Sequence, residues 1–274
     1  MKYSTVDLTP RIGTEVETDK ATLLSGALAE EIRSLLEKRG VLLFRGIQLD
    51  DEQEIAFAAT LGSLRAEFGH RSMAITPDKK FNPIFADYFE ANVFWHFDGA
   101  WEDVPPLASI LTPRVLAPAG GETEFADAYG AYEDLPDADK KLLQGLKAVH
   151  TMEAAVAPAF PNPTEKQLEA WRNYPTRIHP LVWRHRSGRR SLALSSTISH
   201  VLDMDRQQSD ALLRRLMAFA TKREYVYQHQ WKINDVLMWN NTGTLHRVLP
   251  FDKGSNRRLQ RVTLLGEEPV VAVA

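Results

Sequence analysis

Apolar positions recur at helical spacing near the start of the chain and at strand-like spacing further on. Residues 21–39 predict a helix that Gly40 ends, because their apolar side chains would share one face: Leu24, Leu28, Ile32, Leu35 and Leu36. The apolar run 41–46 predicts a short buried strand, and residues 50–62 predict a second helix. This order indicates an α/β packing layer at the N-terminus.

From residue 92 onward the chain changes to short strand-like runs separated by Pro and Gly. These runs are residues 107–116, 120–128, 189–196, 235–241 and 257–266. Helical patterns interrupt them at 134–146 and 205–222. Many short strands with turn signals favour a β-sandwich or barrel. The Pro-rich stretch 157–180 breaks the pattern, and long connections of this kind often serve as lids.

Composition narrows the classes of function. The net charge of −3 and the pI near 6.3 give no support for nucleic-acid binding. No apolar run is long enough for a membrane span, and the N-terminus lacks a signal-peptide pattern, so we expect a cytoplasmic protein. The chain has no cysteine. Any metal site must therefore use His, Asp or Glu.

The segment NVFWHFDGAW, residues 92–101, places His96 and Asp98 in an apolar and aromatic setting. On a strand, side chains two residues apart point to the same face, and Phe97 would turn to the opposite face. Such a pair can bind one metal ion, form a buried hydrogen bond, or act as a general base with its orienting partner. Trp95, Trp101 and Trp239 are interpreted as core aromatics.

His246 stands out from the other histidines because it follows a strongly apolar strand and a polar turn. Further on, Arg257, Leu259, Arg261 and Thr263 would share one strand face. Two arginines on an inward face need anionic partners, which a ligand can supply. Two histidines and one carboxylate form the ligand set of non-haem Fe(II) oxygenases, in which open positions accept a 2-oxo acid and dioxygen.

The sequence resembles the taurine / 2,4-dichlorophenoxyacetate dioxygenase family of Fe(II)- and 2-oxoglutarate-dependent enzymes over most of its length. The motifs that carry the resemblance are RGVLLFRG with its following helix (39–62), NVFWHFDGAW (92–101), PAGGETEFADAYGAYEDL (118–135), HPLVWRHRSGRRSL (179–192), WKINDVLMWNNTGTLHR (231–247) and RRLQRVTLLGE (257–267). The resemblance implies one domain over residues 1–274 with a double-stranded β-helix (jelly-roll) core, flanking helices and a lid or insertion at 157–180.

The resemblance also implies roles for individual residues. His96, Asp98 and His246 match the iron ligands of the family. Thr123 and Arg257 match the residues that bind the far carboxylate of 2-oxoglutarate. The remaining matches are Arg261, near the metal-bound carboxylate and the anionic end of the substrate, and Asn92, at the boundary between cosubstrate and substrate.

The substrate region departs from the family pattern. His70 and Arg71 stand in a zone where relatives place a substrate-contacting His or Tyr, and Thr197 or Ser196 stands where the taurine enzyme has an aromatic residue. Taurine is therefore not the expected substrate, and Asp98 favours hydroxylation over halogenation. We expect hydroxylation of a small organic acid with release of succinate and CO2. A biosynthetic oxidase of the same fold, a non-catalytic 2-oxoglutarate or metal sensor, and a homo-oligomeric state stay open.

Overall fold

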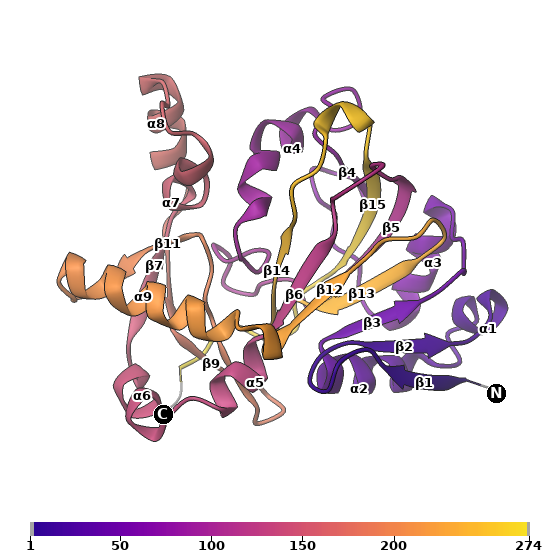
Figure 1. Cartoon of the computed structure of the whole chain (residues 1–274), viewed down its shortest axis with the longest axis horizontal. Helices are drawn as coiled ribbons and strands as arrows, with labels where there is room; N and C mark the ends of the chain where they lie inside the picture. Colours follow the sequence, from indigo (N-terminus) through magenta and orange to yellow (C-terminus); the bar gives the residue numbers. More distant parts are fainter. Residues whose placement is uncertain (1–2, 273–274) are drawn as a thin grey trace.

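A seven-stranded sheet forms the larger layer of the computed structural model, which describes residues 3–272 (Figure 1). Its spatial order is β1 (Ser4–Asp7), β2 (Thr14–Glu17), β3 (Val41–Phe44), β13 (Val236–Asn240), β5 (Ala108–Val115), β15 (Arg258–Leu264) and β4 (Met73–Ile75). All pairs are antiparallel except β2 with β3. Strands distant in sequence therefore become neighbours, and β15 lies beside β5.

A three-stranded antiparallel sheet packs against the inner face of the larger one. It consists of β12 (Val226–His229), β6 (Thr123–Asp127) and β14 (Thr244–Val248). Between the sheets lies a buried cluster formed by Ile12, Val41, Leu43, Leu111, Phe125, Tyr227, Leu237, Trp239 and Leu259. Side chains from both inner faces thus share one core, as in a β-sandwich.

Helices cover the outer face of the larger sheet. They are α1 (Lys20–Leu24), α2 (Ala29–Arg39) and α3 (Asp51–Leu61). In β3, Leu42 and Phe44 pack against these helices, whereas Val41 and Leu43 face the second sheet. Because alternate strand residues point to opposite faces, a strand covered on both faces is apolar throughout. This explains the apolar run that predicted β3.

The single helix predicted over residues 21–39 is wrong, because the chain forms two helices there. α1 ends at Leu24 and α2 begins at Ala29. Gly26 lies between them with φ of +73°, a left-handed conformation that a helix cannot contain. The helix predicted at 50–62 is present as α3, and Asp50 caps it by accepting a hydrogen bond from the Gln53 amide.

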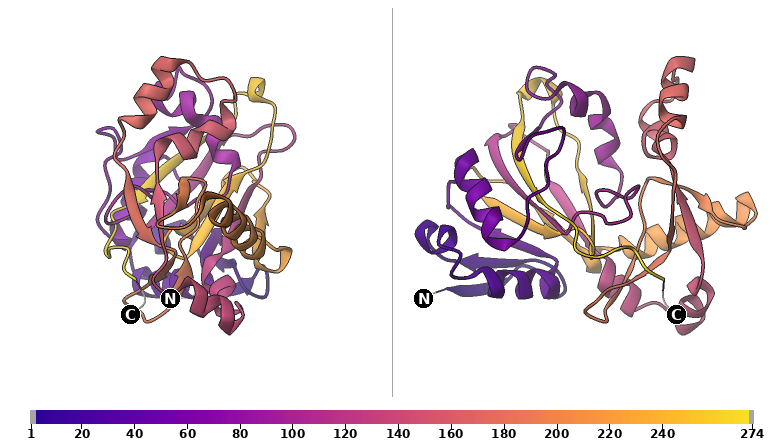
Figure 2. Two further views of the ribbon diagram at one scale, coloured as in Figure 1. Left: turned by 90° about the vertical axis from the view of Figure 1, so that its left-hand side faces the viewer. Right: turned by 180° about the vertical axis from the view of Figure 1, so that it is seen from behind.

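A second group of elements lies at the other end of the molecule, away from α1 (Figure 2). Its strands are β7 (Lys147–His150), β8 (Arg177–Pro180), β9 (Val182–Arg184), β10 (Arg190–Leu192) and β11 (Ile198–Val201). Its helices are α5 (Ala128–Glu133), α6 (Asp137–Leu143) and α9 (Arg206–Ala220). A third apolar cluster joins α9, α5 and β9, and includes Trp183, Leu216 and Tyr225.

The stretch 157–180 is partly regular. It contains α8 (Glu165–Arg172), which stands beside α7 (Met152–Val156), and it ends in β8 (Figure 1). Thr164 caps α8 in a capping box with Gln167. The remaining elements are α4 (Pro83–Tyr88) and the 3-10 helices η1 (Phe89–Val93), η2 (Ala157–Ala159), η3 (Arg223–Tyr225) and η4 (Lys253–Ser255). Among residues 3–272, no helix combines the length and apolarity needed to cross a bilayer.

Candidate metal and cosubstrate site

His96, Asp98 and His246 converge on one point beside β14, of which His246 is the central residue. One potential ligand atom from each residue lies within 4.8 Å of the other two. The His96 amide donates to the His246 carbonyl over 3.1 Å, and the His246 amide donates back over 2.8 Å. This reciprocal bridge brings the two imidazole ring centroids within 4.2 Å of each other. The separation suits two nitrogen ligands on one face of a metal ion.

The strand geometry used to relate His96 and Asp98 is not present. η1 occupies Phe89–Val93, His96 pairs with His246 through an isolated bridge, and the chain then turns. Gly99 follows Asp98 with φ of +71°. Asp98 therefore reaches the site from a turn and not from a strand face. The Asn241 side chain fixes this turn, because it accepts from the Asp98 amide over 2.7 Å and donates to the Asp98 carbonyl over 3.0 Å.

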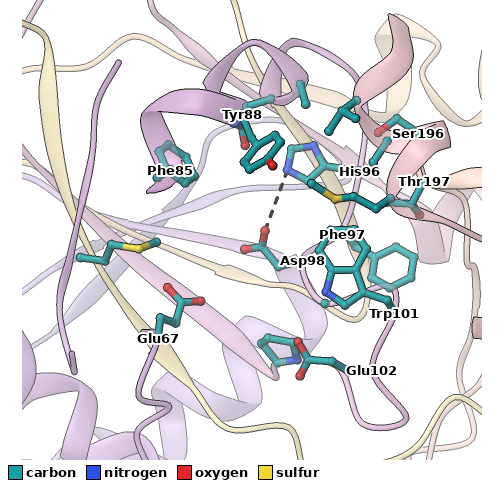
Figure 3. Close-up of a pocket in the computed structure, with 18 of the residues that line it drawn as sticks. Glu67, Phe85, Tyr88, His96, Phe97, Asp98, Trp101, Glu102, Ser196 and Thr197 are labelled. Atoms are coloured by element: carbon teal, nitrogen blue, oxygen red, sulfur yellow. Dashed lines mark ion pairs between the residues drawn. The ribbon is translucent and has the colours of Figure 1, made fainter. Parts of the chain in front are cut away.

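The side chains of the triad are oriented for metal binding. His96 Nδ1 lies 2.8 Å from the Phe94 carbonyl, so this nitrogen carries the proton and Nε2 offers its lone pair. Asp98 Oδ2 accepts from Arg261 over 3.2 Å. Asp98 Oδ1 lies 3.9 Å from His96 Nε2 (Figure 3). The same oxygen lies 3.8 Å from His246 Nε2. One carboxylate oxygen and two imidazole nitrogens thus face the same space.

The charge states of the triad also suit a cation. Burial raises the pKa of Asp98, but the nearby Arg261 and the two histidines outweigh burial and hold it at about 2. Burial, together with His96, lowers the pKa of His246 to about 3. At neutral pH the site therefore presents a carboxylate and an unprotonated imidazole, which are the ligand forms that metal binding requires.

Beside the triad lies a small cavity lined by Thr123, Arg257, Asn92 and both histidines. Arg257 is 2% exposed, donates to the Gly121 carbonyl over 2.7 Å and stacks on Phe251. Burial lowers its pKa to about 10, and no ion pair with a carboxylate is present for it among residues 3–272. A buried guanidinium without a paired anion is costly.

These residues fit 2-oxoglutarate. An incoming carboxylate would supply the anion that Arg257 lacks, and guanidinium and carboxylate match in a bidentate geometry. The Thr123 hydroxyl already accepts from Trp231 Nε1 over 3.0 Å, so its own proton is available to a carboxylate oxygen. Two oxygens at the other end of a 2-oxo acid would then face the triad. The His–Asp–His set fits Fe(II) because two imidazole nitrogens and one carboxylate oxygen are the donors of non-haem Fe(II) sites.

A larger cavity of about 380 Å³ opens on the other side of His96 and Asp98. Figure 3 shows Phe85, Tyr88, Phe97 and Trp101 around His96 and Asp98. Other apolar lining comes from Phe68, Met73, Met152, Val156 and Tyr174. An aromatic wall of this size suits a substrate with an aryl or bulky apolar body.

Both arginines that line the larger cavity are already paired. Arg261 donates to Glu67 over 2.9 Å as well as to Asp98. Arg65 lies 2.7 Å from Glu102 and 3.8 Å from Glu67. Glu67 and Asp98 also raise the pKa of Arg261 and outweigh its burial, so it stays charged. A substrate anion must therefore share one of these arginines with a glutamate.

The structure separates the residues expected to contact substrate. Thr197 and Asn92 line the larger cavity, together with Arg261. His70 and Arg71 lie on the exposed end of a turn that Glu67 and His70 close, and neither lines the cavity. Phe97, expected on the face opposite His96 and Asp98, and Trp101, expected in the core, both line the cavity. Sequence reasoning missed Arg65, Glu67, Phe85, Tyr88 and Met152, since their positions carry no local signal for the site.

Comparisons with known proteins place the chain in a family. Residues 4–263 match the family described as taurine catabolism dioxygenase TauD, TfdA family. The chain is 35% identical over 264 residues to the alpha-ketoglutarate-dependent 2,4-dichlorophenoxyacetate dioxygenase of Burkholderia sp. (strain RASC), covering 89% of this chain and 87% of the relative. It is 32% identical to the alpha-ketoglutarate-dependent sulfate ester dioxygenase of Pseudomonas putida, over 95% of this chain and 88% of the relative.

Solved structures agree. The crystal structure of AAD-2 in complex with Mn(II) and N-oxalylglycine superposes with a TM-score of 0.85 at 30% identity, covering 99% of this chain and all of the other (100%). A taurine dioxygenase from Burkholderia xenovorans superposes with a TM-score of 0.79 at 28% identity, covering 100% and 95%. The predicted jelly-roll fold with flanking helices is thereby confirmed. The chain belongs to the TauD/TfdA family and is a non-haem iron dioxygenase that depends on 2-oxoglutarate.

Proposed function

We propose that this enzyme hydroxylates a small organic acid that has an aryl or bulky apolar body. The observation that carries this proposal is a cavity of about 380 Å³ with aromatic walls that opens directly onto His96 and Asp98. Relatives named for 2,4-dichlorophenoxyacetate and for (S)-phenoxypropionate act on acids of this shape. Hydroxylation of the carbon next to an ether oxygen gives an unstable product that separates into a phenol and an aldehyde acid.

We assign the cofactor sites by residue. His96, Asp98 and His246 hold Fe(II), which supplies dioxygen activation coupled to decarboxylation of 2-oxoglutarate to succinate and CO2. Arg257 and Thr123 hold the far carboxylate of 2-oxoglutarate, and Asn92 separates cosubstrate from substrate. The apolar walls exclude water from the reacting groups. The assignments of the iron and 2-oxoglutarate residues rest on the distances and charge states described above, and that of Asn92 rests on its place in the lining of both cavities.

The substrate anion is proposed to meet Arg261, as the sequence comparison implied. Arg65 stands beside it, and its side chain is 26% exposed, against 12% for Arg261. Either guanidinium can turn one of its donors toward a carboxylate while it keeps a glutamate partner, because a guanidinium offers five donors. His70 and Arg71 are then left for the outer approach to the cavity.

The test is formation of succinate and phenol from phenoxyacetate under air, with Fe(II) and 2-oxoglutarate supplied. Methyl phenoxyacetate serves as the neutral partner, and Arg261→Gln and Arg65→Gln are compared with the wild type. We expect the acid to be preferred and one of the two variants to lose that preference. Equal oxidation of acid and ester in all three proteins would show that no cationic anchor exists.

The same assay distinguishes the proposed hydroxylase from the two alternative functions. A non-catalytic sensor would bind 2-oxoglutarate but form no succinate with any acid. A desaturating or cyclising oxidase would form succinate with a product that gains no oxygen, which mass spectrometry detects. A chelator should abolish turnover, and added Fe(II) should restore it, whereas His246→Ala should stay inactive.

The proposal extends to the domain organisation, cellular location and oligomeric state of the enzyme. We propose one catalytic domain over residues 1–274 that acts in the cytoplasm, without nucleic-acid or membrane partners. Tyr174 lines the larger cavity from within the stretch 157–180, which supports a lid role for that stretch. A homo-oligomer is the remaining expectation, and size-exclusion chromatography with light scattering tests it.

A further inference from the structure

A buried histidine outside the metal site contacts the wall of the substrate cavity. His150 is the last residue of β7 and is 0% exposed. Its Nδ1 lies 2.7 Å from the Thr197 hydroxyl, and Thr197 lines the larger cavity (Figure 3). Neither the metal triad nor the cosubstrate cavity uses His150. Its position therefore calls for a separate explanation.

The surroundings of His150 hold it rigidly and keep it neutral. The Phe97 ring lies edge-on at 6.2 Å between centroids, and the His179 ring lies at 5.3 Å. β11 pairs with β7 at this point, so that Ile198 lies opposite His150. Burial, together with His179, lowers the pKa of His150 to about 3. The imidazole thus carries a single proton, on either Nδ1 or Nε2.

Hydrogen bonding decides between the two nitrogens. His150 Nε2 has no hydrogen-bond partner in the part of the chain that the structure describes. A proton on Nε2 would leave a buried N–H donor unsatisfied, which native proteins rarely tolerate, whereas an unpaired acceptor is tolerated more often. The proton therefore belongs on Nδ1, and Nδ1–H donates to the Thr197 oxygen.

This assignment fixes what Thr197 offers to a substrate. The amide of Thr151 donates to the Thr197 carbonyl over 2.9 Å, which anchors the backbone. With one lone pair of the Thr197 hydroxyl taken by His150, the hydroxyl proton is left to donate, and Thr197 lines the cavity. We propose that His150 positions Thr197 as a hydrogen-bond donor to an oxygen acceptor of the substrate, and that this pair selects substrates by that oxygen.

The proposal deepens the proposed function and rests on it for the choice of substrate. An aryloxy acid carries two kinds of acceptor near the reacting carbon, the ether oxygen and the carboxylate. Phenoxyacetate and 3-phenylpropanoate differ in the ether position alone, where a methylene group replaces oxygen. Thr197→Val removes the hydroxyl at nearly constant shape, and Thr197→Ser keeps it.

The experiment measures KM and kcat for both acids in the wild type and in the variants. We expect Thr197→Val and His150→Leu each to raise KM for phenoxyacetate about three- to tenfold, the range of one neutral hydrogen bond. Thr197→Ser and His150→Asn should restore most of the affinity, since each keeps a donor at the same place. The double variant should be no worse than either single one, because both act through one hydroxyl.

The second acid identifies the acceptor. If Thr197→Val raises KM for phenoxyacetate but leaves KM for 3-phenylpropanoate unchanged, the ether oxygen is the partner. If KM rises equally for both acids, the carboxylate is the partner. Unchanged KM for both acids in Thr197→Val overturns the proposal.

A spectroscopic measurement decides the proton position without any substrate. Nitrogen-15 spectra of histidine-labelled protein loaded with Zn(II) and N-oxalylglycine report which ring nitrogen is protonated, and the signals lost in His150→Asn assign His150. A protonated Nδ1 supports the proposal, and a protonated Nε2 overturns it. If wild-type enzyme forms no succinate with phenoxyacetate, the proposed aryloxy acid function fails, and these spectra still test the His150–Thr197 donor.

Discussion

Arg261 binds one oxygen of Asp98 and leaves the other facing His96 and His246. Its Nη1 lies 3.2 Å from Asp98 Oδ2, while Oδ1 faces the Nε2 atoms of both histidines. Glu67 holds the other end of the guanidinium at 2.9 Å. In the proposed metal site, Asp98 would therefore bind through a single oxygen, and Arg261 would orient it.

Arg261→Gln should therefore weaken metal binding even without substrate. Loss of an outer partner of a metal ligand typically lowers metal affinity roughly 10–100-fold. Calorimetric titration of the metal-free protein with Mn(II) measures the effect. Arg258→Gln is the matched control, because Arg258 lies on the same strand and stacks on Phe81 away from the triad. Equal Mn(II) affinity in wild type and Arg261→Gln would contradict this role.

Arg257→Ala should weaken 2-oxoglutarate binding far more than metal binding. The substitution leaves the incoming carboxylate unpaired in a buried site, at a cost of roughly 2–5 kcal/mol. The readout is titration of the Mn(II)-loaded protein with 2-oxoglutarate, beside titration of the metal-free protein with Mn(II). A parallel loss of both affinities would mean that Arg257 supports the fold and not the cosubstrate.

Gly121→Ala should produce the same defect by displacing Arg257. A Cβ at position 121 would lie 2.6 Å from Arg257 Nε, and Gly121 has φ of +78°. Gly188→Ala is the control, because Gly188 has φ of +88° and nothing within 4 Å of its added Cβ. Both variants carry backbone strain, but the first alone should lose affinity for 2-oxoglutarate. Equal affinities in the two variants would refute a contact effect.

Thr123→Ala should cost less than Arg257→Ala. It removes one hydrogen bond to a charged group, on the order of 1–3 kcal/mol of 2-oxoglutarate binding. Trp231→Phe should weaken binding in the same direction but less, because it frees the Thr123 hydroxyl from the indole donor that orients it. The same titration of Mn(II)-loaded protein measures both. A larger loss for Trp231→Phe than for Thr123→Ala would place the main effect in the packing of the indole.

Local patterns predicted the central strands of the larger sheet, because the spacing of apolar residues reflects which strand faces are buried. β3, β5, β13 and β15 lie within the predicted runs, since each is covered on at least one face by a core. His96 and Asp98 were correctly paired but wrongly placed on a strand. A single backbone bridge between His96 and His246 joins segments far apart in the sequence. The spacing of apolar residues along the chain does not indicate this bridge.

The residues that line the substrate cavity could not be predicted from the sequence. Phe85 and Tyr88 enter it from α4 and Met152 from α7, and Tyr88 packs against the apolar cluster that includes Met152. Their apolar side chains read as ordinary core residues. The pairing of Arg261 with Glu67 was hidden for the same reason, although the inward position of Arg261 was predicted correctly from strand alternation.

Glu54 makes the stability of the fold depend on pH. It is 0% exposed on α3, with Thr112 donating over 2.5 Å and Arg114 over 3.0 Å. Burial raises its pKa from 4.5 to about 8 and outweighs these two donors. Because the folded-state pKa lies above the unfolded value, the folded state binds more protons between these two values. The stabilisation is therefore complete below pH 4.5 and is lost as the pH rises through about 8.

Glu54→Gln should remove this dependence. In the wild type, the free energy of unfolding should fall by up to about 1.4 kcal/mol per pH unit in that range. The amide keeps an oxygen for Thr112 and carries no charge to desolvate, while Arg114 keeps its contact with Asp51 at 2.6 Å. Urea unfolding of the metal-free protein at pH 5 and pH 8 gives the comparison. Glu52→Gln, on the exposed side of the same helix, should follow the wild type. A Glu54→Gln protein that loses as much stability as the wild type between the two pH values would show that Glu54 is ionised in the fold throughout.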